Sequence, residues 1–231
     1  GSIEAEALLA VGVYAGGYDV DVSNAGSIDA SSDVFAIGVE ALAGYAEVSN
    51  SGSISVDSSL VAVGILAAGA SGVDVANSGS IDATGNVAVG VQVSGQDLAV
   101  TNAEAGTIDV TGYASAAGIN LNGLYVHAYN YGDITVLADG IGAEATGISA
   151  GSASGTVYVL NNGHITVTAD ESYGTTLTAV ETPDASATGI NAVSGKTRND
   201  PSLVNTLLDG PNDINVVNGP LGVITVLANG T

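Results

Sequence analysis

Carboxylate side chains recur along this chain at a spacing that could bring them together. Asp21, Glu47 and Asp74 are about 26 residues apart, and Asp82 precedes Asp109 by a similar interval. If successive segments stack, such residues become neighbours about 5 Å apart, where their negative charges repel. A hard cation such as Ca²⁺ would relieve this repulsion, so the five residues are candidate ligands of a weak calcium site. The alternative is a solvated acidic face, because the chain has neither a glycine-aspartate calcium repeat nor an EF-hand loop.

Carboxylates at this separation also match the catalytic pair of a retaining glycosidase, and parallel β-helices include polysaccharide hydrolases and lyases. Such enzymes usually present basic or aromatic residues to the sugar, whereas the cations of this chain are only Lys196 and Arg198. No P-loop, dinucleotide fingerprint or HExxH motif occurs. We therefore do not expect an enzyme, and a polysaccharide-active one is the third of three hypotheses.

A second group of chemistry-bearing residues is aromatic. His127 and Tyr158 share a position in successive repeats, with Tyr125 and Tyr131 nearby. Together they could form a flat platform for a sugar ring or for an apolar protein surface. The alternative is a stabilising stack of rings between turns. His164 falls in a different row, so the two histidines do not make a metal pair.

The elements that would position these residues come from a sequence repeat. An A-x-G-[VI]-x-[AVL] segment alternates with an N-x-G-x-I-x-[AV] segment, at intervals mostly near 26 residues. The glycines of the first segment are Gly12, Gly38, Gly64, Gly90, Gly118, Gly147 and Gly189, and the second begins at Asn24, Asn50, Asn77, Asn102, Asn130, Asn161 and Asn218. A repeat of this length predicts stacked coils of strand.

Each repeat contains three short runs that alternate apolar and polar residues, as strands with one buried face do. Val20-Asp21-Val22 precedes the first asparagine, Ile28-Asp29-Ala30 follows it, and Val13-Tyr14-Ala15 follows the first repeat glycine. The pattern predicts an all-β fold: a right-handed parallel β-helix of about seven coils, with three short strands per coil. Each strand then pairs with its copy one coil on.

The repeated asparagines have the inward parity of the valines before them. We expect each to lie at a bend with its amide inside, where stacked amides can hydrogen-bond as a ladder. Their predicted role is structural, not ligand binding.

Composition limits the possible partners. The formal net charge is -22, with 24 acidic residues against two basic ones, so nucleic acid and a direct contact with the bilayer are not expected. Hydrophobic residues make up 46% of the chain, enough apolar surface for a folded state. Cysteine is absent, which excludes disulfides and zinc-thiolate sites. No cofactor is expected beyond the weak calcium site.

The repeat predicts one domain over residues 1–231, with the sequence a piece of a longer array. Regularity fails between Asn161 and Asn218, where we expect loop excursions at 170–186 and 194–213. Loops that interrupt a solenoid project from its side and often carry recognition. Lys196 and Arg198 in the second excursion are therefore candidate ligand-binding residues. The alternative is a tolerated insertion with no specific role.

The N-[AS]-G-[ST]-I-x-[AV] and A-x-G-[IV]-x-[AV] motifs, in a chain rich in Gly, Ala, Ser and Thr, resemble the β-helical passenger regions of Gram-negative autotransporters and filamentous-haemagglutinin-like adhesins. The resemblance covers nearly the whole chain. It implies an extracellular location on the bacterial surface, attachment through a barrel outside this sequence, and a role in adhesion, self-aggregation or biofilm formation. The implied partners are a host-surface protein or glycan, or another copy of the chain.

Two hypotheses therefore stand beside the enzyme. The first is a surface-exposed adhesin passenger segment that binds through its elongated face and projecting loops. The second is a structural spacer, stalk or surface-layer element.

Overall fold

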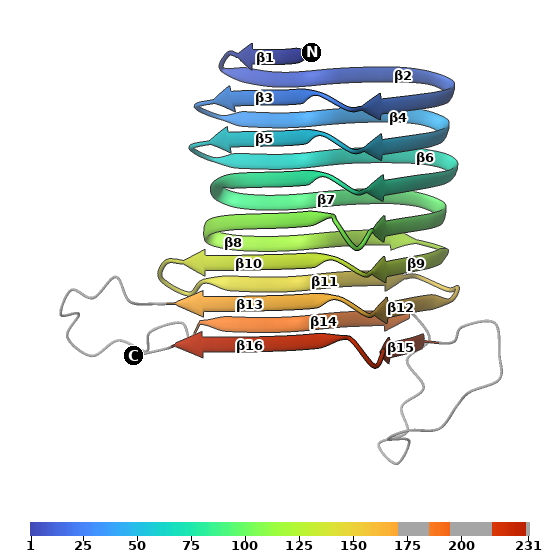
Figure 1. Ribbon diagram of the computed structural model, residues 1–231, viewed down its shortest axis with the longest axis vertical. Coiled ribbons are helices and arrows are strands. Elements are labelled where there is room, and N and C mark those ends of the chain that lie inside the picture. The colour runs from blue at the N-terminus through green and yellow to red at the C-terminus, as the bar shows by residue number, and fades with distance from the viewer. Residues whose placement is uncertain (171–184, 195–213, 230–231) are drawn as a thin grey trace.

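A computed structural model describes residues 1–170, 185–194 and 214–229 of the chain. These residues form a parallel β-solenoid of about six turns of roughly 27 residues, and they contain no helix. The turns stack into one elongated body (Figure 1). The predicted all-β parallel solenoid is confirmed, with six turns between seven asparagine bends in place of about seven coils. The right-handed sense of the coil stays a prediction.

Sixteen strands make up the described stack, and each pairs in parallel with its copy in the next turn. They are β1 (Ser2–Glu6), β2 (Leu9–Asn24), β3 (Ser27–Ser32), β4 (Phe35–Asn50), β5 (Ser53–Ser58), β6 (Val61–Asn77), β7 (Ser80–Asn102), β8 (Thr107–Gly123), β9 (Tyr125–Asn130), β10 (Asp133–Asp139), β11 (Glu144–Ser152), β12 (Val157–Asn161), β13 (His164–Asp170), β14 (Ser186–Ser194), β15 (Ile214–Asn218) and β16 (Val223–Asn229).

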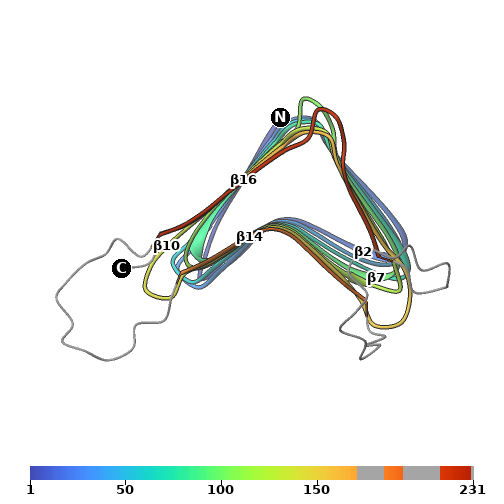
Figure 2. The same cartoon turned by 90° about the horizontal axis from the view of Figure 1, so that it is seen from below.

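The cross-section is a three-sided coil (Figure 2). One side runs through β1, β3, β5, β7, β8, β10, β13 and β16. The other two sides begin within the same long strands, β2, β4, β6 and β7, whose pairing continues around the corner between the sides. Later turns divide these sides into separate strands, such as β11 and β12. The expected three short strands per coil therefore occur only in the later turns.

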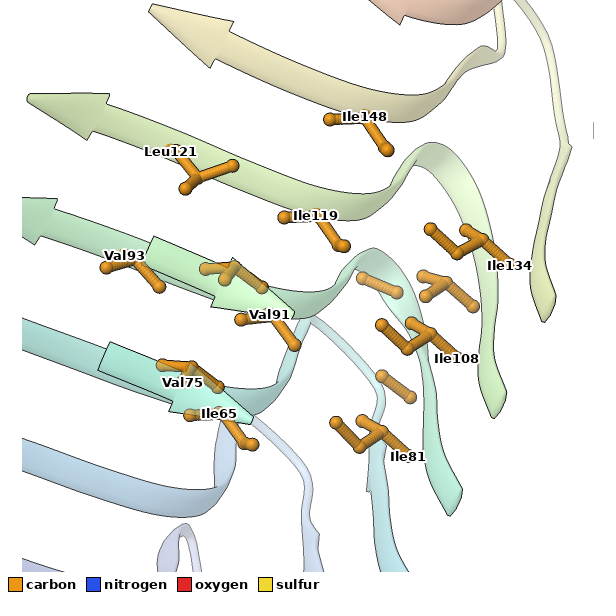
Figure 3. Close-up of a cluster of buried hydrophobic side chains, with 14 of the residues drawn as sticks. Ile65, Val75, Ile81, Val91, Val93, Ile108, Ile119, Leu121, Ile134 and Ile148 are labelled. Carbon is orange, nitrogen blue, oxygen red and sulfur yellow. The ribbon is translucent and has the colours of Figure 1, made fainter. Parts of the chain in front are cut away.

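The core is a narrow stack of small and branched side chains. Equivalent isoleucines after the first six asparagine bends lie above one another and are almost fully buried: Ile28, Ile54, Ile81, Ile108, Ile134 and Ile165. Figure 3 shows Ile81, Ile108 and Ile134 in such a column, opposite a second column that includes Ile119 and Ile148. Complete burial of one such side chain contributes about 1.5–3 kcal/mol. Six turns of repetition therefore supply one continuous core.

The repeat glycines lie within strands, where this core is thinnest. A Cβ on Gly64 would lie 2.4 Å from Ile81 Cγ2 and 2.5 Å from the carbonyl oxygen of Gly90 in the next turn. No side chain fits at that distance, because the neighbouring backbone oxygen cannot move away without breaking the stack. The glycine of the A-x-G motif is therefore required for the turns to pack.

The two predicted excursions fall almost entirely on residues 171–184 and 195–213, outside the described residues. Their flanks are described: Asp170 ends β13, and Ser186 and Ser194 bound β14. Lys196 and Arg198 also lie outside the described residues, so their candidate role stays a prediction.

Candidate functional site

The asparagines form a hydrogen-bonded row inside the bends. Each side-chain amide donates from Nδ2 to Oδ1 of the next asparagine over 2.8–2.9 Å, from Asn24 through to Asn218. The same amides also donate to bend carbonyls, as Asn102 does to the oxygens of Gly106 and Asp133. Because these groups are committed to one another, the row holds the turns in register and offers nothing to a ligand.

The predicted acidic row is also in register. Asp21 pairs with Glu47 and Glu47 with Asp74, on the exposed side of β2, β4 and β6. The Tyr45 hydroxyl donates to Asp74 Oδ2 over 2.5 Å. This hydrogen bond, with smaller effects of burial and of the charges on Asp74 and Glu47, raises the pKa of Tyr45 to about 12. The carboxylate of Asp74, at one end of the acidic row, is thus already hydrogen-bonded to a tyrosine hydroxyl.

Asp82 and Asp109 pair directly between β7 and β8. Burial raises the pKa of Asp82 above its ordinary value, and the charge on Asp109 raises it further. Nevertheless, across the described ranges no three His, Cys, Asp or Glu side chains come together in a group that could hold a metal ion. The five carboxylates are neighbours in rows, and the geometry adds no support for calcium beyond that.

The aromatic residues form a cluster that differs from the predicted one. His127 and Tyr158 are paired in register with their ring centroids 6.3 Å apart at an edge-on angle of 78°. Tyr129, which is not among the predicted residues, completes the group, with its centroid 5.7 Å from Tyr158 and 6.3 Å from His127. Burial raises the pKa of Tyr129, and the nearby hydroxyls of Tyr158 and Tyr131 raise it further. We call His127, Tyr129 and Tyr158 the ring cluster.

The alternation of the strand could have identified Tyr129. Residues one and three places before each asparagine both point outward, so His127 and Tyr129 share a face. A shallow hollow of about 390 Å³ beside the rings is lined by the ring cluster with Thr156, Val157 and Asn215. The half-exposed rings can therefore meet a ligand as a group.

Tyr125 and Tyr131 lie apart from these ring contacts. Tyr125 is exposed at the start of β9, in register with Asp97. Tyr131 is exposed in the bend after Asn130, where it lines a different recess. The structure therefore separates the four predicted residues: His127 and Tyr158 belong to the ring cluster on β9 and β12, Tyr131 lines a recess at the asparagine bends, and Tyr125 belongs to neither.

Comparisons of the chain with protein-family models, with curated proteins and with solved structures find no match. In the stretches that the structure describes, no helix has both the length and the apolar composition needed to cross a bilayer. The strand pairing and the sequence repeat alone therefore define the fold.

Proposed function

We propose that this chain is a segment of a surface-exposed bacterial adhesin, which binds host material or another copy of itself along its elongated face. The observation that carries the proposal is the ring cluster, which groups three aromatic side chains on the outside of a rod whose core is entirely packed. Aromatic rings that are half exposed and held by neighbours supply contact area at low entropic cost.

Polar rows on another side of the rod favour the same function. Outward positions of the later turns carry hydrogen-bonding residues in register, such as Asn120 with Ser149 and Ser149 with Asn191. Repeated weak contacts along a rod act together, so total affinity exceeds that of any one contact. The resemblance to autotransporter passengers supports a location on the bacterial surface, with the anchor elsewhere in the protein.

The proposal is tested by displaying the chain on beads and measuring their attachment to epithelial cells and to one another. Replacing His127, Tyr129 and Tyr158 together by alanine should reduce attachment at least about tenfold, because most binding energy resides in a few aromatic contacts. Tyr14→Ala is the matched control, since Tyr14 is an exposed tyrosine on another side of the rod. Attachment that persists in the triple variant, with its circular dichroism unchanged, would contradict the proposal.

Self-association of the chain should depend on the salt concentration. The chain carries a formal charge of -22, so copies repel at low ionic strength and screening by salt should promote bead aggregation. Aggregation that is unchanged between 20 mM and about 500 mM NaCl would leave host binding as the remaining form of the proposal.

A structural spacer is the second candidate, favoured by the continuous core and by the asparagine row, which make the rod stiff. A spacer keeps its function when the ring cluster is removed. The bead experiment therefore separates the two candidates directly.

A further inference from the structure

The bends that follow the asparagines are unequal in length. After Asn130 and Asn161 the next strand begins three residues later, whereas after Asn102 and Asn218 it begins five residues later. The two longer bends project beyond the others, as the green and red loops at the top of Figure 2 show. Along the stack, the longer bends therefore flank two consecutive shorter ones.

A recess of about 700 Å³ lies over the shorter bends. Glu104 comes from one longer bend and Leu221 from the other, and Tyr131 and Asn162 come from the shorter bends between them. Asp133 and His164, at the starts of β10 and β13, and Thr101 of β7 add polar side chains to the lining. The volume is that of an ordinary small-molecule site.

The recess is held in shape by hydrogen bonds of the bends. The N–H of Tyr131 donates to the Asn102 oxygen over 2.8 Å, and that of Asn162 to the Asn130 oxygen over 2.7 Å. The Leu221 N–H donates to Asn162 Oδ1 over 3.2 Å, which ties the longer bend to the floor. A rigid site loses little conformational entropy when a ligand binds, so modest contacts suffice for affinity.

The histidine is oriented as well. His164 Nδ1 lies 3.0 Å from Asp133 Oδ1, in a pair that is exposed to solvent. This contact occupies one ring nitrogen and leaves Nε2 available to a ligand. The carboxylate of Asp133 keeps further acceptor capacity, because an ionised carboxylate accepts several hydrogen bonds.

The mixture of donors and acceptors defines the ligand class. Glu104 and Asp133 accept, the Asn162 amide nitrogen donates, and Thr101 and His164 can do either. Anionic ligands are disfavoured by the two carboxylates and by the charge of the chain. A purely cationic ligand would leave the donors unused. Neutral sugars present hydroxyl groups that both donate and accept, together with an apolar ring face that packs on an aromatic side chain such as Tyr131.

We propose that this recess binds a short neutral glycan, with Tyr131 as the stacking platform and Glu104, Asp133, Asn162 and His164 as hydrogen-bonding partners. The assignment rests on the binding function proposed above but uses a site separate from the ring cluster. It names both the ligand class and the part of the rod that contacts it.

The test is titration calorimetry of the whole chain with neutral oligosaccharides of two to four hexose units. Tyr131→Ala should raise the dissociation constant at least about tenfold, because it removes the stacking contact. Glu104→Gln should raise it about threefold, because it weakens a single hydrogen bond. Tyr113→Ala and Glu144→Gln are the matched controls, as both positions are exposed and lie outside the recess. The controls should stay within about twofold of the parent chain.

Two further titrations decide the ligand class. Oligogalacturonate represents anionic sugars and oligolysine represents a basic polypeptide, and neither should bind in a manner that depends on Tyr131. The proposal is overturned if no neutral oligosaccharide binds, if binding is unchanged in Tyr131→Ala, or if oligolysine is the probe that the recess variants affect. Circular dichroism of each variant shows that lost binding does not reflect a lost fold.

Failure of this assignment can be told from failure of the proposed function. Oligosaccharide binding that is absent from the parent chain or unchanged in Tyr131→Ala, together with bead attachment that the ring-cluster variant still abolishes, would refute the glycan recess and leave the adhesin intact. Tyr131-dependent oligosaccharide binding by a chain whose beads do not attach would refute the adhesin and leave the recess.

Discussion

Two rows run along the same edge of this molecule and behave in opposite ways. Inside the bends, the side chain is asparagine at every turn from Asn24 to Asn218, and each copy hydrogen-bonds the next. Three residues before each asparagine, an outer row begins as Asp21, Glu47 and Asp74. It continues as Ala99, His127, Tyr158 and Asn215. Stacking therefore repeats an amide hydrogen bond along the inner row, and it repeats a repulsion between carboxylates at the start of the outer row.

The difference shows which positions a solenoid can change. An inner amide has partners on both sides, so replacing it costs two turns their contacts. An outer residue faces water, so its identity can pass from acidic to aromatic along the rod without loss of register. Binding surfaces can therefore vary on the outer rows while the inner row keeps the fold.

The strongest way to break this comparison is Asn102→Ala. The change removes the hydrogen bonds to Asn130 Oδ1 and to two carbonyls, and it takes one of three acceptors from the buried Asn77 Nδ2. We expect a loss of about 3 kcal/mol in the free energy of unfolding, measured by urea denaturation. Asp21→Ala in the outer row should change it by less than about 0.5 kcal/mol. Equal losses for the two variants would show that the inner row is no more important than the outer one.

A second test compares an inner glycine with an outer one. A Cβ on Gly64 would collide with Ile81 and with the next backbone, so Gly64→Ala should cost about 2–3 kcal/mol. A Cβ on Gly17 would be no nearer than 3.5 Å to Val20 Cγ2, which is ordinary contact. Gly17→Ala should therefore be close to neutral in the same denaturation experiment. A tolerated Gly64→Ala would mean that neighbouring turns can move apart.

A third test sharpens the view of the outer row by titrating Tyr45. Its pKa in the folded chain is about 12, above the ordinary value of 10.0, so its contact with Asp74 stabilises the fold fully below pH 10. That contribution is lost as pH rises through about 12. Ultraviolet absorbance of the phenolate should show a transition near pH 12 that Tyr45→Phe removes. Asp74→Asn should move the transition back toward 10.0.

The smallest expected effect concerns Asp82. Its pKa is raised in the folded chain, so the fold is stabilised when pH falls through that raised value and the carboxyl gains a proton. Asp82→Asn should therefore raise the free energy of unfolding at pH 7 by up to about 0.5 kcal/mol. The gain should disappear under acidic conditions that protonate Asp82. A destabilised variant at pH 7 would show that this carboxylate makes a favourable contact.

The repeat predicted the register of the stack because it reports directly on burial. Inward valines such as Val48 and Val75 are buried and paired as the alternation requires. The continuous strands around one corner were not predicted, since backbone pairing through a bend depends on geometry and leaves no pattern in side-chain type. The number of turns differed because seven bends enclose six intervals.

The candidate sites were predicted less completely. The alternation predicted that His127 and Tyr158 would meet, but Tyr129 was not predicted, because it occupies the outward position directly before Asn130, outside the apolar-polar-apolar run that marks the strand. The recess was missed although its signal is present: Ile108 lies six residues after Asn102, whereas Ile134 lies four after Asn130. Differences in bend length are small in the sequence, yet they decide which bends project and which form a floor.

The asparagine row also gives the rod a direction. The amides from Asn24 to Asn161 each donate to the asparagine of the following turn, so the six bonds point the same way. The side-chain dipoles consequently add along the long axis, with the positive pole toward the later turns, and each bond polarises its neighbours. A substitution in the middle divides one long aligned chain of dipoles into two short ones, whereas the same substitution at either end shortens it by one.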